Sequence, residues 1–223
     1  MPRPTRIVIV PGLAVRSYAK PAADALRIAG HNVALLRPPA WYGAPYDLED
    51  YGSRLAAQIA ARGEVVDVLV GLSVGCQAAG IAAAQSDLVR SLLLVSPTVD
   101  PCNRDQLTLL RAWAAPKDGD GGGGDEEPGF LASIPDWAHA GLWRIVRGWN
   151  SAIAALPLEE VLPQVRSHVT IIHSEHDRLG SAQWAAELAR LAGGRFLTMN
   201  GASHSWPVGD ESGFAKIIED LTR

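Results

Sequence analysis

The sequence predicts an α/β fold: a mostly parallel, doubly wound, six-stranded sheet with a helical insertion. Short apolar runs rich in β-branched residues alternate with longer segments of helical spacing along the 223 residues. This alternation is typical of right-handed crossovers between parallel strands. The runs are apolar on both faces, as expected of strands that helices cover on either side. One interval is far longer than a single crossover needs, and this predicts the insertion.

Each expected element is bounded by recognisable signals. The first helix closes on Gly30, and Asp47 is placed to cap the second, since a side-chain oxygen there accepts free amide hydrogens. The expected strands lie at 6–10, 32–36, 65–71, 90–96, 168–174 and 195–200. The expected helices lie at 17–30, 47–63, 74–85, 181–192 and 211–222.

The long interval lies between Pro97 and His168, which are separated by 70 residues. Helical spacing at 104–115 and 136–156 predicts that these residues form a helical cap. Between the two helical segments the chain is rich in glycine and acidic residues, cannot bury a core, and is expected to be a flexible loop. The predicted division is a core domain of 1–97 and 168–223, a cap of 98–167 and, within the cap, a loop at 117–129.

Composition excludes several classes of function. With 48% apolar and 20% charged residues the chain can build a globular core, and its net charge of −4 comes without any Lys/Arg cluster of the kind that nucleic acids require. Only four consecutive apolar residues precede Pro11, too few for a signal peptide or a spanning helix. We therefore expect a soluble, cytoplasmic protein. Its two cysteines form no disulfide framework, and Cys76 is expected to be a small buried side chain.

Ser73 is the first candidate for chemistry. It stands in Gly-Leu-Ser-Val-Gly, where an apolar strand turns at once into an Ala-rich helix. So sharp a turn strains the backbone at its apex and leaves no room for side chains two positions away, hence Gly71 and Gly75. The strain holds the hydroxyl above the carboxyl end of the sheet, where ligands bind in open α/β folds. The pattern is that of a nucleophile elbow, although a tight turn with a capping serine would look similar.

A serine nucleophile needs a base, and the base needs an orienting carboxylate. Two later strands end in these residues and in the required order: the fifth leads to Asp177 and the sixth to His204. Alternatives remain at each position. Asp177 could instead cap the helix that begins near Ser181, His204 could be an ordinary loop histidine, and Asp100, after the fourth strand, is another place for the acid.

The developing oxyanion needs two amide donors. The residue after the nucleophile, Val74, should supply one, and the loop after the first strand should supply the other, from Leu13 or, as second choice, Ala14. Aromatic walls for a substrate should come from the loop after the second strand and from the cap. The candidate substrate-binding residues are Trp41, Tyr42, Trp137 and Trp143.

The chain resembles the α/β-hydrolase superfamily, in particular serine esterases and thioesterases with a helical cap. The motifs that carry the resemblance are GLSVG, HSEHDRLG and GASHSWP, which match three catalytic segments of that superfamily. The six strands match its core without the first two strands. The oxyanion loop reads Pro-Gly-Leu-Ala where many members have His-Gly, and the acid segment lacks a frequent proline.

These observations predict hydrolysis of a carboxylic ester or thioester of a small apolar molecule, without cofactor or metal. Ser73, Asp177 and His204 would be the catalytic triad. The superfamily also contains other reaction classes, so a lyase or cyclase using the same triad is one alternative and a non-catalytic binding protein another. The spacing of His173, His176 and Asp177 would suit metal ligands on a helix, but these residues lie at the end of a strand. No convincing further ligand set is evident in the sequence. We therefore expect no metal site there.

Overall fold

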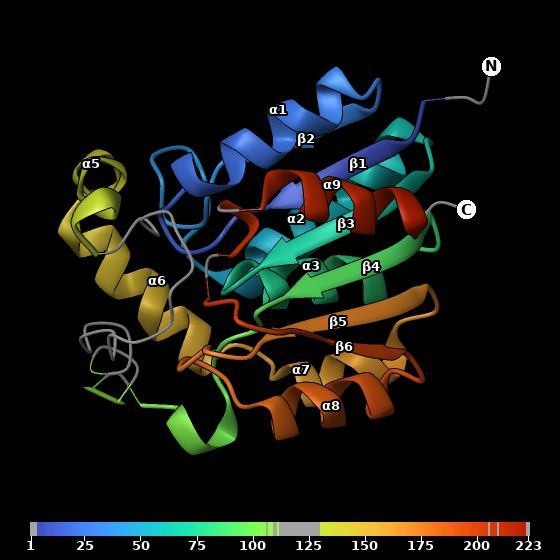
Figure 1. The fold of residues 1–223 in the computed structure, drawn as a ribbon. Coiled ribbons are helices and arrows are strands. Elements are labelled where there is room, and N and C mark those ends of the chain that lie inside the picture. Colours follow the sequence, from blue (N-terminus) through green and yellow to red (C-terminus); the bar gives the residue numbers. More distant parts are fainter. Residues whose placement is uncertain are drawn as a thin grey trace.

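The structure is a computed structural model that describes residues 4–105, 107–108, 111, 130–204, 206–208 and 210–221. Its centre is a six-stranded sheet in the order β2-β1-β3-β4-β5-β6, and all five strand pairings are parallel. The predicted fold class is therefore confirmed (Figure 1). The strands are β1 Arg6–Val10, β2 Asn32–Leu35, β3 Val66–Leu72, β4 Val89–Val95, β5 His168–Ser174 and β6 Arg195–Met199.

Helices cover both faces of the sheet. The expected helix at 17–30 begins as a short 3-10 turn, and Asp47 caps α2 by accepting from the amides of Glu49 and Asp50. The helices are η1 Ser17–Ala19, α1 Lys20–Ile28, α2 Leu48–Arg62, α3 Gly75–Ala84, η2 Pro101–Asn103, α5 Phe130–Ala140, α6 Leu142–Ala154, α7 Leu158–Val161, η3 Leu162–Gln164, α8 Ala182–Leu191, η4 Trp206–Val208 and α9 Glu211–Asp220.

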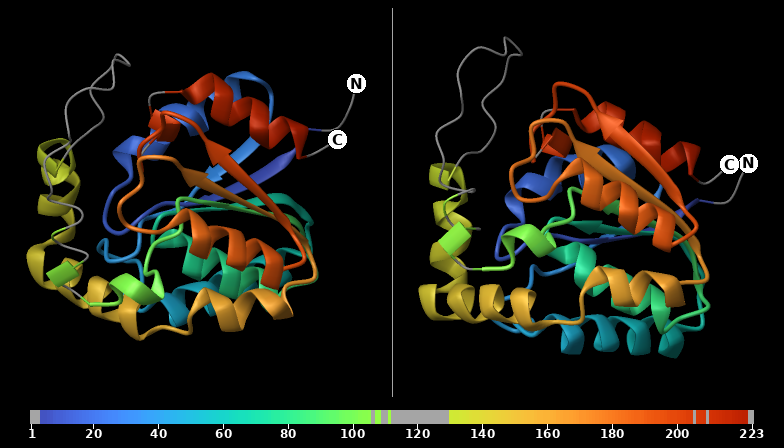
Figure 2. Two further views of the ribbon diagram at one scale, coloured as in Figure 1. Left: turned by 60° about the horizontal axis from the view of Figure 1, so that its bottom comes forward. Right: turned by 90° about the horizontal axis from the view of Figure 1, so that it is seen from below.

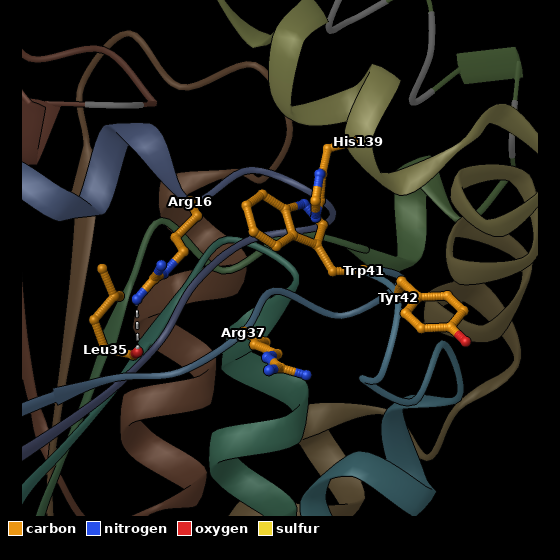
Figure 3. A pocket seen from close by; sticks show the side chains of 6 residues that line it. All are labelled: Arg16, Leu35, Arg37, Trp41, Tyr42 and His139. Carbon is orange, nitrogen blue, oxygen red and sulfur yellow. Dashed lines mark hydrogen bonds between the residues drawn. The ribbon is translucent and has the colours of Figure 1, made fainter.

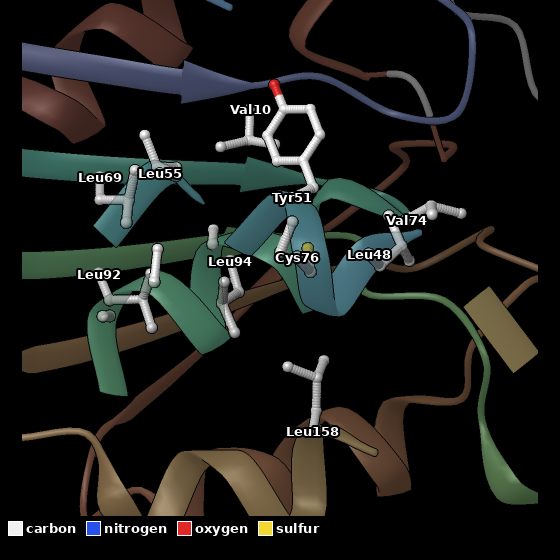
Figure 4. Close-up of a cluster of buried hydrophobic side chains, with 14 of the residues drawn as sticks. Val10, Leu48, Tyr51, Leu55, Leu69, Val74, Cys76, Leu92, Leu94 and Leu158 are labelled. Atoms are coloured by element: carbon white, nitrogen blue, oxygen red, sulfur yellow. The ribbon is translucent and has the colours of Figure 1, made fainter. Parts of the chain in front are cut away.

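The core has two layers, one on each face of the sheet. Side chains of α2, α3, α7 and α8 pack against one face, and those of α1 and α9 pack against the other. The first layer is shown in Figure 4, where Leu158 of α7 and Tyr51 of α2 approach the strands from opposite sides of α3. Leu158 and Leu162 are almost fully buried, so this end of the 98–167 segment covers the sheet rather than the strand ends.

The expected continuous helix at 136–156 is two helices. The chain breaks at Gly141, whose φ of +84° is a left-handed conformation that favours glycine. Helical spacing persists across the break, so the sequence pattern alone could not reveal it. The loop predicted at 117–129 and most of the helix predicted at 104–115 lie outside the described residues.

The helices α5 and α6 lie beyond the carboxyl ends of the strands (Figures 1 and 2). Asp136 of α5 holds the loop after β1: its Oδ2 accepts hydrogen bonds from the amides of Arg16 and Ser17 and from the Ser17 hydroxyl, at 2.7 to 2.9 Å. On α6, Gly148 packs so closely that a Cβ there would lie 2.5 Å from Leu13. These contacts join the cap helices to the loop expected to supply the oxyanion hole. No helix among the described residues combines the length and the apolar character needed to cross a bilayer.

Candidate active site

Backbone strain gathers at the carboxyl edge of the sheet. Among the described residues, every non-glycine residue with positive φ stands at the end of β3 or in the loops after β1, β2 and β4. Such conformations persist only where the surrounding structure holds them, and they are common at functional sites. These residues are Ala14, Ala40, Ser73, Ser96 and Val99.

Ser73 occupies the turn between β3 and α3 with a φ of +54°, as the elbow motif predicts. The flanking glycines are required by close approach rather than by their own dihedral angles. A Cβ at Gly71 would lie 2.7 Å from the Cα of Cys76, and one at Gly75 would lie 2.5 Å from the carbonyl oxygens of Val10 and Pro11. The tight packing of strand end against helix start therefore fixes the position of the Ser73 hydroxyl.

We expect Gly75→Ala to destabilise the protein by about 1–3 kcal/mol, the usual cost of forcing extra atoms into a packed core. The carbonyl oxygens of Val10 and Pro11 leave the new methyl group no room, so the end of β1 or the elbow must shift. Chemical denaturation measures the loss. Ala57→Gly is the control, because Ala57 is exposed on α2 and its replacement tests an ordinary helix position. Gly63→Ala would be a poor control, because Gly63 has a φ of +63°. A Gly75→Ala variant as stable as the wild type would contradict the packing argument.

The three residues of the predicted triad meet in one hydrogen-bonded line. His204 Nε2 lies 2.9 Å from Ser73 Oγ, and His204 Nδ1 lies 2.9 Å from Asp177 Oδ2. The Asp177 side chain is fully buried, while His204 remains 21% exposed. Asp177 Oδ1 accepts the amide hydrogen of Leu179 at 2.8 Å, which orients the carboxylate. This geometry lets the imidazole take a proton from the Ser73 hydroxyl while the carboxylate holds its other N–H.

Asp100 is engaged elsewhere. Its Oδ2 accepts hydrogen bonds from the amide and the hydroxyl of Ser181 at 3.0 and 2.6 Å, and its Oδ1 accepts from the amide of Cys102. Burial raises its pKa, but these hydrogen bonds outweigh burial, so the pKa of Asp100 lies below its ordinary value. Ser181 in turn caps α8. Asp100 thus fixes the start of α8, just beyond the loop that carries Asp177.

Stability should depend on pH through Asp100. A carboxylate whose pKa is lower in the folded than in the unfolded state stabilises the fold above its unfolded pKa, and this contribution disappears as pH falls through the folded value. We therefore expect Asp100→Asn to be less stable than the wild type at pH 7, with a gap that narrows as pH falls below about 3.8. Denaturation at several pH values measures the gap. A gap independent of pH would show that the charge of Asp100 contributes nothing.

The two predicted oxyanion donors are buried amides with no hydrogen-bond partner among the described residues. Val74 is 1% exposed and stands next to Ser73 at the start of α3, where the helix dipole favours negative charge. Leu13 is 7% exposed and follows Gly12, at which a Cβ would lie 3.3 Å from the Cβ of Ser73. Buried amides are normally paired. A pair left without partners beside a nucleophile suits an oxyanion.

Ala14, the second choice for a donor, is committed to the fold. Its amide donates to the carbonyl oxygen of Pro39 at 3.0 Å, and its own carbonyl oxygen accepts from Nε1 of Trp41 at 2.7 Å. Both partners lie in the loop after β2, so this loop holds Ala14 in its strained conformation and thereby sets the direction of the preceding Leu13 amide. On the other side, the hydroxyl of the partly buried Tyr18 accepts the amide hydrogen of Gly12 at 2.8 Å.

The loop after β2 is in turn held by Arg144 of α6. Its Nε donates to the carbonyl oxygen of Ala40 at 2.7 Å, and its Nη2 donates to those of Trp41 and Ala44 at 2.8 and 2.6 Å. Three charge-assisted hydrogen bonds to one short loop make Arg144 a positioning residue that acts on the oxyanion loop through Trp41. Sequence reasoning did not identify it, because nothing about an arginine on an amphipathic helix indicates three carbonyl partners.

We expect Arg144→Met to lower kcat of the hydrolysis proposed below by about 10- to 100-fold, since small displacements of a catalytic group cost this much. Methionine keeps much of the length but none of the hydrogen bonds. Arg147→Met is a matched control: Arg147 lies one turn further along α6 and its guanidinium stacks on Tyr46, 4.1 Å from the ring centroid. Steady-state kinetics and thermal midpoints measure both variants. Equal losses of kcat in the two would contradict the positioning role.

The structure places the four aromatic candidates differently. Trp41 and Trp137 are partly buried and pack against the core. Tyr42 is 81% exposed and Trp143 is 70% exposed on the outer side of α6, with Arg147 above its ring at 5.9 Å from the centroid. A pocket of about 720 Å³ is lined by Trp41 and Tyr42 together with residues that sequence reasoning missed. The missed residues are Arg16, Leu35, Arg37 and His139.

The remaining cysteine and histidine candidates lie outside the hydrogen-bonded line of Ser73, His204 and Asp177. Cys76 is buried, and its Sγ–H is within reach of the carbonyl oxygens of Gly71 and Val95. His173 is buried in β5, where burial lowers its pKa and the nearby Asp177 carboxylate partly opposes this effect. His176 is exposed. Within the described part of the chain, no three His, Cys, Asp or Glu side chains are arranged to hold a metal ion.

Comparisons with known proteins agree with this architecture. A comparison with curated proteins gave no significant match. Among solved structures, an esterase from Rhodococcus sp. ECU1013 is 17% identical, with a TM-score of 0.67 over 98% of this chain and 90% of that one. An enol-lactonase from Burkholderia xenovorans LB400 is 18% identical, with a TM-score of 0.69 over 98% and 91%. A hydrolase from Oleispira antarctica is 13% identical, with a TM-score of 0.76 over 99% and 92%.

These similarities identify the fold, and a family model extends them to the sequence. The model of the alpha/beta hydrolase family matches residues 7–217, which is nearly the whole chain. The match includes the six strands, except the first residue of β1, and the segments that bring Ser73, Asp177 and His204 together. The chain therefore belongs to the alpha/beta hydrolase family.

Proposed function

We propose that the protein hydrolyses a carboxylic ester or thioester through an acyl-enzyme on Ser73. The observation that carries the proposal is the line of hydrogen bonds from Ser73 through His204 to the buried Asp177. Beside it lie the amides of Leu13 and Val74, for which the described residues offer no hydrogen-bond partner. A nucleophile, a base, an orienting acid and an oxyanion site are the parts that acyl transfer needs.

Each residue has one task in the proposed reaction. Ser73 Oγ attacks the acyl carbon while His204 Nε2 takes its proton, and Asp177 stabilises the imidazolium that results. The Leu13 and Val74 amides donate to the oxyanion of the tetrahedral intermediate. His204 then gives the proton to the departing alcohol or thiol. In the second half, His204 takes a proton from water, the hydroxide attacks the acyl group, and the proton returns to Ser73.

The acyl or alcohol group of the substrate is proposed to be apolar. The Leu13 side chain is in van der Waals range of Gly148 on α6, so α6 closes the region above the oxyanion loop with apolar atoms. Partly buried Trp41 and Trp137 add aromatic surface on the same side of the molecule. Aromatic and aliphatic walls favour apolar ligands. Trp143 is exposed and is not proposed to contact the substrate.

Hydrolysis in labelled water tests the reaction class. The substrate is p-nitrophenyl butyrate in H₂¹⁸O, and the expected product is butyrate that carries one ¹⁸O atom, formed by the wild type and not by Ser73→Ala. A lyase or cyclase with the same triad would transform its substrate without incorporating the label, and a binding protein would release no nitrophenol above background. The proposal would be contradicted if neither this ester nor its thioester analogue gave enzyme-dependent ¹⁸O-butyrate.

A further inference from the structure

The pocket beside the oxyanion loop has an unusual combination of walls. Its volume is about 720 Å³, and the described residues that line it include two arginines, a histidine and two aromatic residues but no carboxylate. This is notable in a chain with 24 acidic and 20 basic residues. Figure 3 shows the Trp41 ring in the middle of the pocket, with Arg16 and Tyr42 on opposite sides and His139 against the ring. The centroids of the Trp41 and His139 rings are 4.5 Å apart.

Among the described residues, the guanidinium group of Arg16 has no counter-ion. Its Nη2 makes one long hydrogen bond, 3.4 Å, to the carbonyl oxygen of Leu35, and its buried Nε–H has no partner in the described part of the chain. The neighbouring carboxylate of Asp136 accepts from backbone amides and a hydroxyl instead. Leaving a partly buried charge uncompensated is costly, so an unpaired arginine in a pocket wall indicates an anionic ligand.

Arg37 brings a second cation to the same pocket. It is exposed, and the described residues offer it no ion pair. Its guanidinium lies against Gly43, where a Cβ would stand 2.6 Å from Nη1, so the glycine leaves room for it. Guanidinium groups bind carboxylates through paired N–H donors. The rings of Trp41 and Tyr42 offer apolar surface beside that charge.

We propose that this pocket binds an organic anion: a carboxylate attached to an aromatic or aliphatic body. The positive charges of Arg16 and Arg37 attract the carboxylate, while Trp41, Tyr42 and His139 contact the body. The pocket is separate from the triad, but it adjoins the reaction because Trp41 both lines it and donates to the carbonyl oxygen of Ala14. The carboxylate can belong to a free acid or to the far end of the substrate. In the second case the substrate carries a negative charge at the end remote from its ester, in addition to the apolar group that the tryptophans indicate.

Calorimetric titration of Ser73→Ala with phenylacetate tests the site without requiring catalysis, so its outcome is independent of the proposed hydrolysis. Phenylacetate should bind, and neutral phenylacetamide and inorganic phosphate should bind at least about tenfold more weakly, because each lacks one half of the recognition. In the same background, Arg16→Gln and the exposed Arg37→Gln should each weaken phenylacetate binding by about tenfold. Arg166→Gln, which removes an 81% exposed arginine on another part of the surface, is the matched control.

Competition then distinguishes the two sources of the carboxylate. If it belongs to the substrate, phenylacetate should raise KM for an ester that carries a free carboxylate, mono-p-nitrophenyl adipate, without changing kcat; if a free acid is the ligand, phenylacetate should change the kcat for neutral p-nitrophenyl butyrate through Trp41 and the oxyanion loop. Either kinetic effect of phenylacetate supports the site if that effect disappears in Arg37→Gln. Equal binding of phenylacetate and phenylacetamide, or phenylacetate affinity unchanged in both arginine variants, would overturn the proposal.

Discussion

Ser73→Ala should lower the kcat of ester hydrolysis by about 10⁶-fold, leaving only the residual catalysis that the oxyanion amides and substrate binding supply. The methyl group removes the atom that forms the acyl-enzyme, while the amides of Leu13 and Val74 and the imidazole of His204 keep their places. Because Ser73 holds its strained φ of +54° with or without the hydroxyl, the fold should survive the change. Stopped-flow or steady-state release of nitrophenol measures the loss.

Ser96→Ala is the control for this prediction. Ser96, at the end of β4, also has positive φ, and its hydroxyl lies 3.0 Å from that of Ser174 rather than beside His204. Ser96→Ala should therefore retain most of the activity and lose only a buried hydrogen bond, worth about 1 kcal/mol of stability. Comparable rates in Ser73→Ala and the wild type would remove Ser73 from the mechanism.

Asp177→Asn should lower turnover by up to about 10⁴-fold. The reason lies in the second partner of the carboxylate. Asp177 Oδ1 accepts the amide hydrogen of Leu179, so the single oxygen of asparagine should stay there and turn the NH₂ group toward His204. His204 Nδ1 must then accept a hydrogen bond and Nε2 must carry the proton, which leaves no base for Ser73. Kinetics at pH 7 measure the effect.

Asp100→Asn is the matched control for Asp177→Asn. Both replace a carboxylate that accepts hydrogen bonds in a loop after a strand, but Asp100 pairs with Ser181 and Cys102 rather than with the imidazole. It should lose stability and keep turnover near that of the wild type. The reverse ranking of activity, in two equally folded variants, would assign the acid to Asp100.

The sequence predicted the sheet, and the meeting of Ser73, Asp177 and His204, because both depend on local patterns. Apolar runs, helical spacing and the Gly-x-Ser-x-Gly turn fix each strand and its exit, and parallel strands place their exits on one edge. Asp177 and His204 could therefore be assigned from the ends of β5 and β6 although they are far from Ser73 in the chain. The break at Gly141 was not predictable in this way, because a single left-handed residue leaves the helical spacing on either side intact.

What the sequence could not predict is contact between segments without a shared pattern. The hydrogen bonds from Arg144 to three carbonyl oxygens, and from Trp41 to Ala14, depend on where α6 lies over the loop after β2. Trp41 was predicted to line a substrate pocket, and it does line a pocket, but its indole N–H also holds the oxyanion loop. The arginines of that pocket come from two different loops whose meeting only the fold reveals.

The most direct test of the proposed mechanism is the site of covalent labelling by a fluorophosphonate. The probe mimics the tetrahedral intermediate, so it requires an activated nucleophile and an oxyanion hole together. Peptide mass spectrometry should find one phosphonate per chain, on Ser73, in the wild type, and none in Ser73→Ala. Labelling of another residue, or undiminished labelling of Ser73→Ala, would contradict the assignment of Ser73 as the nucleophile.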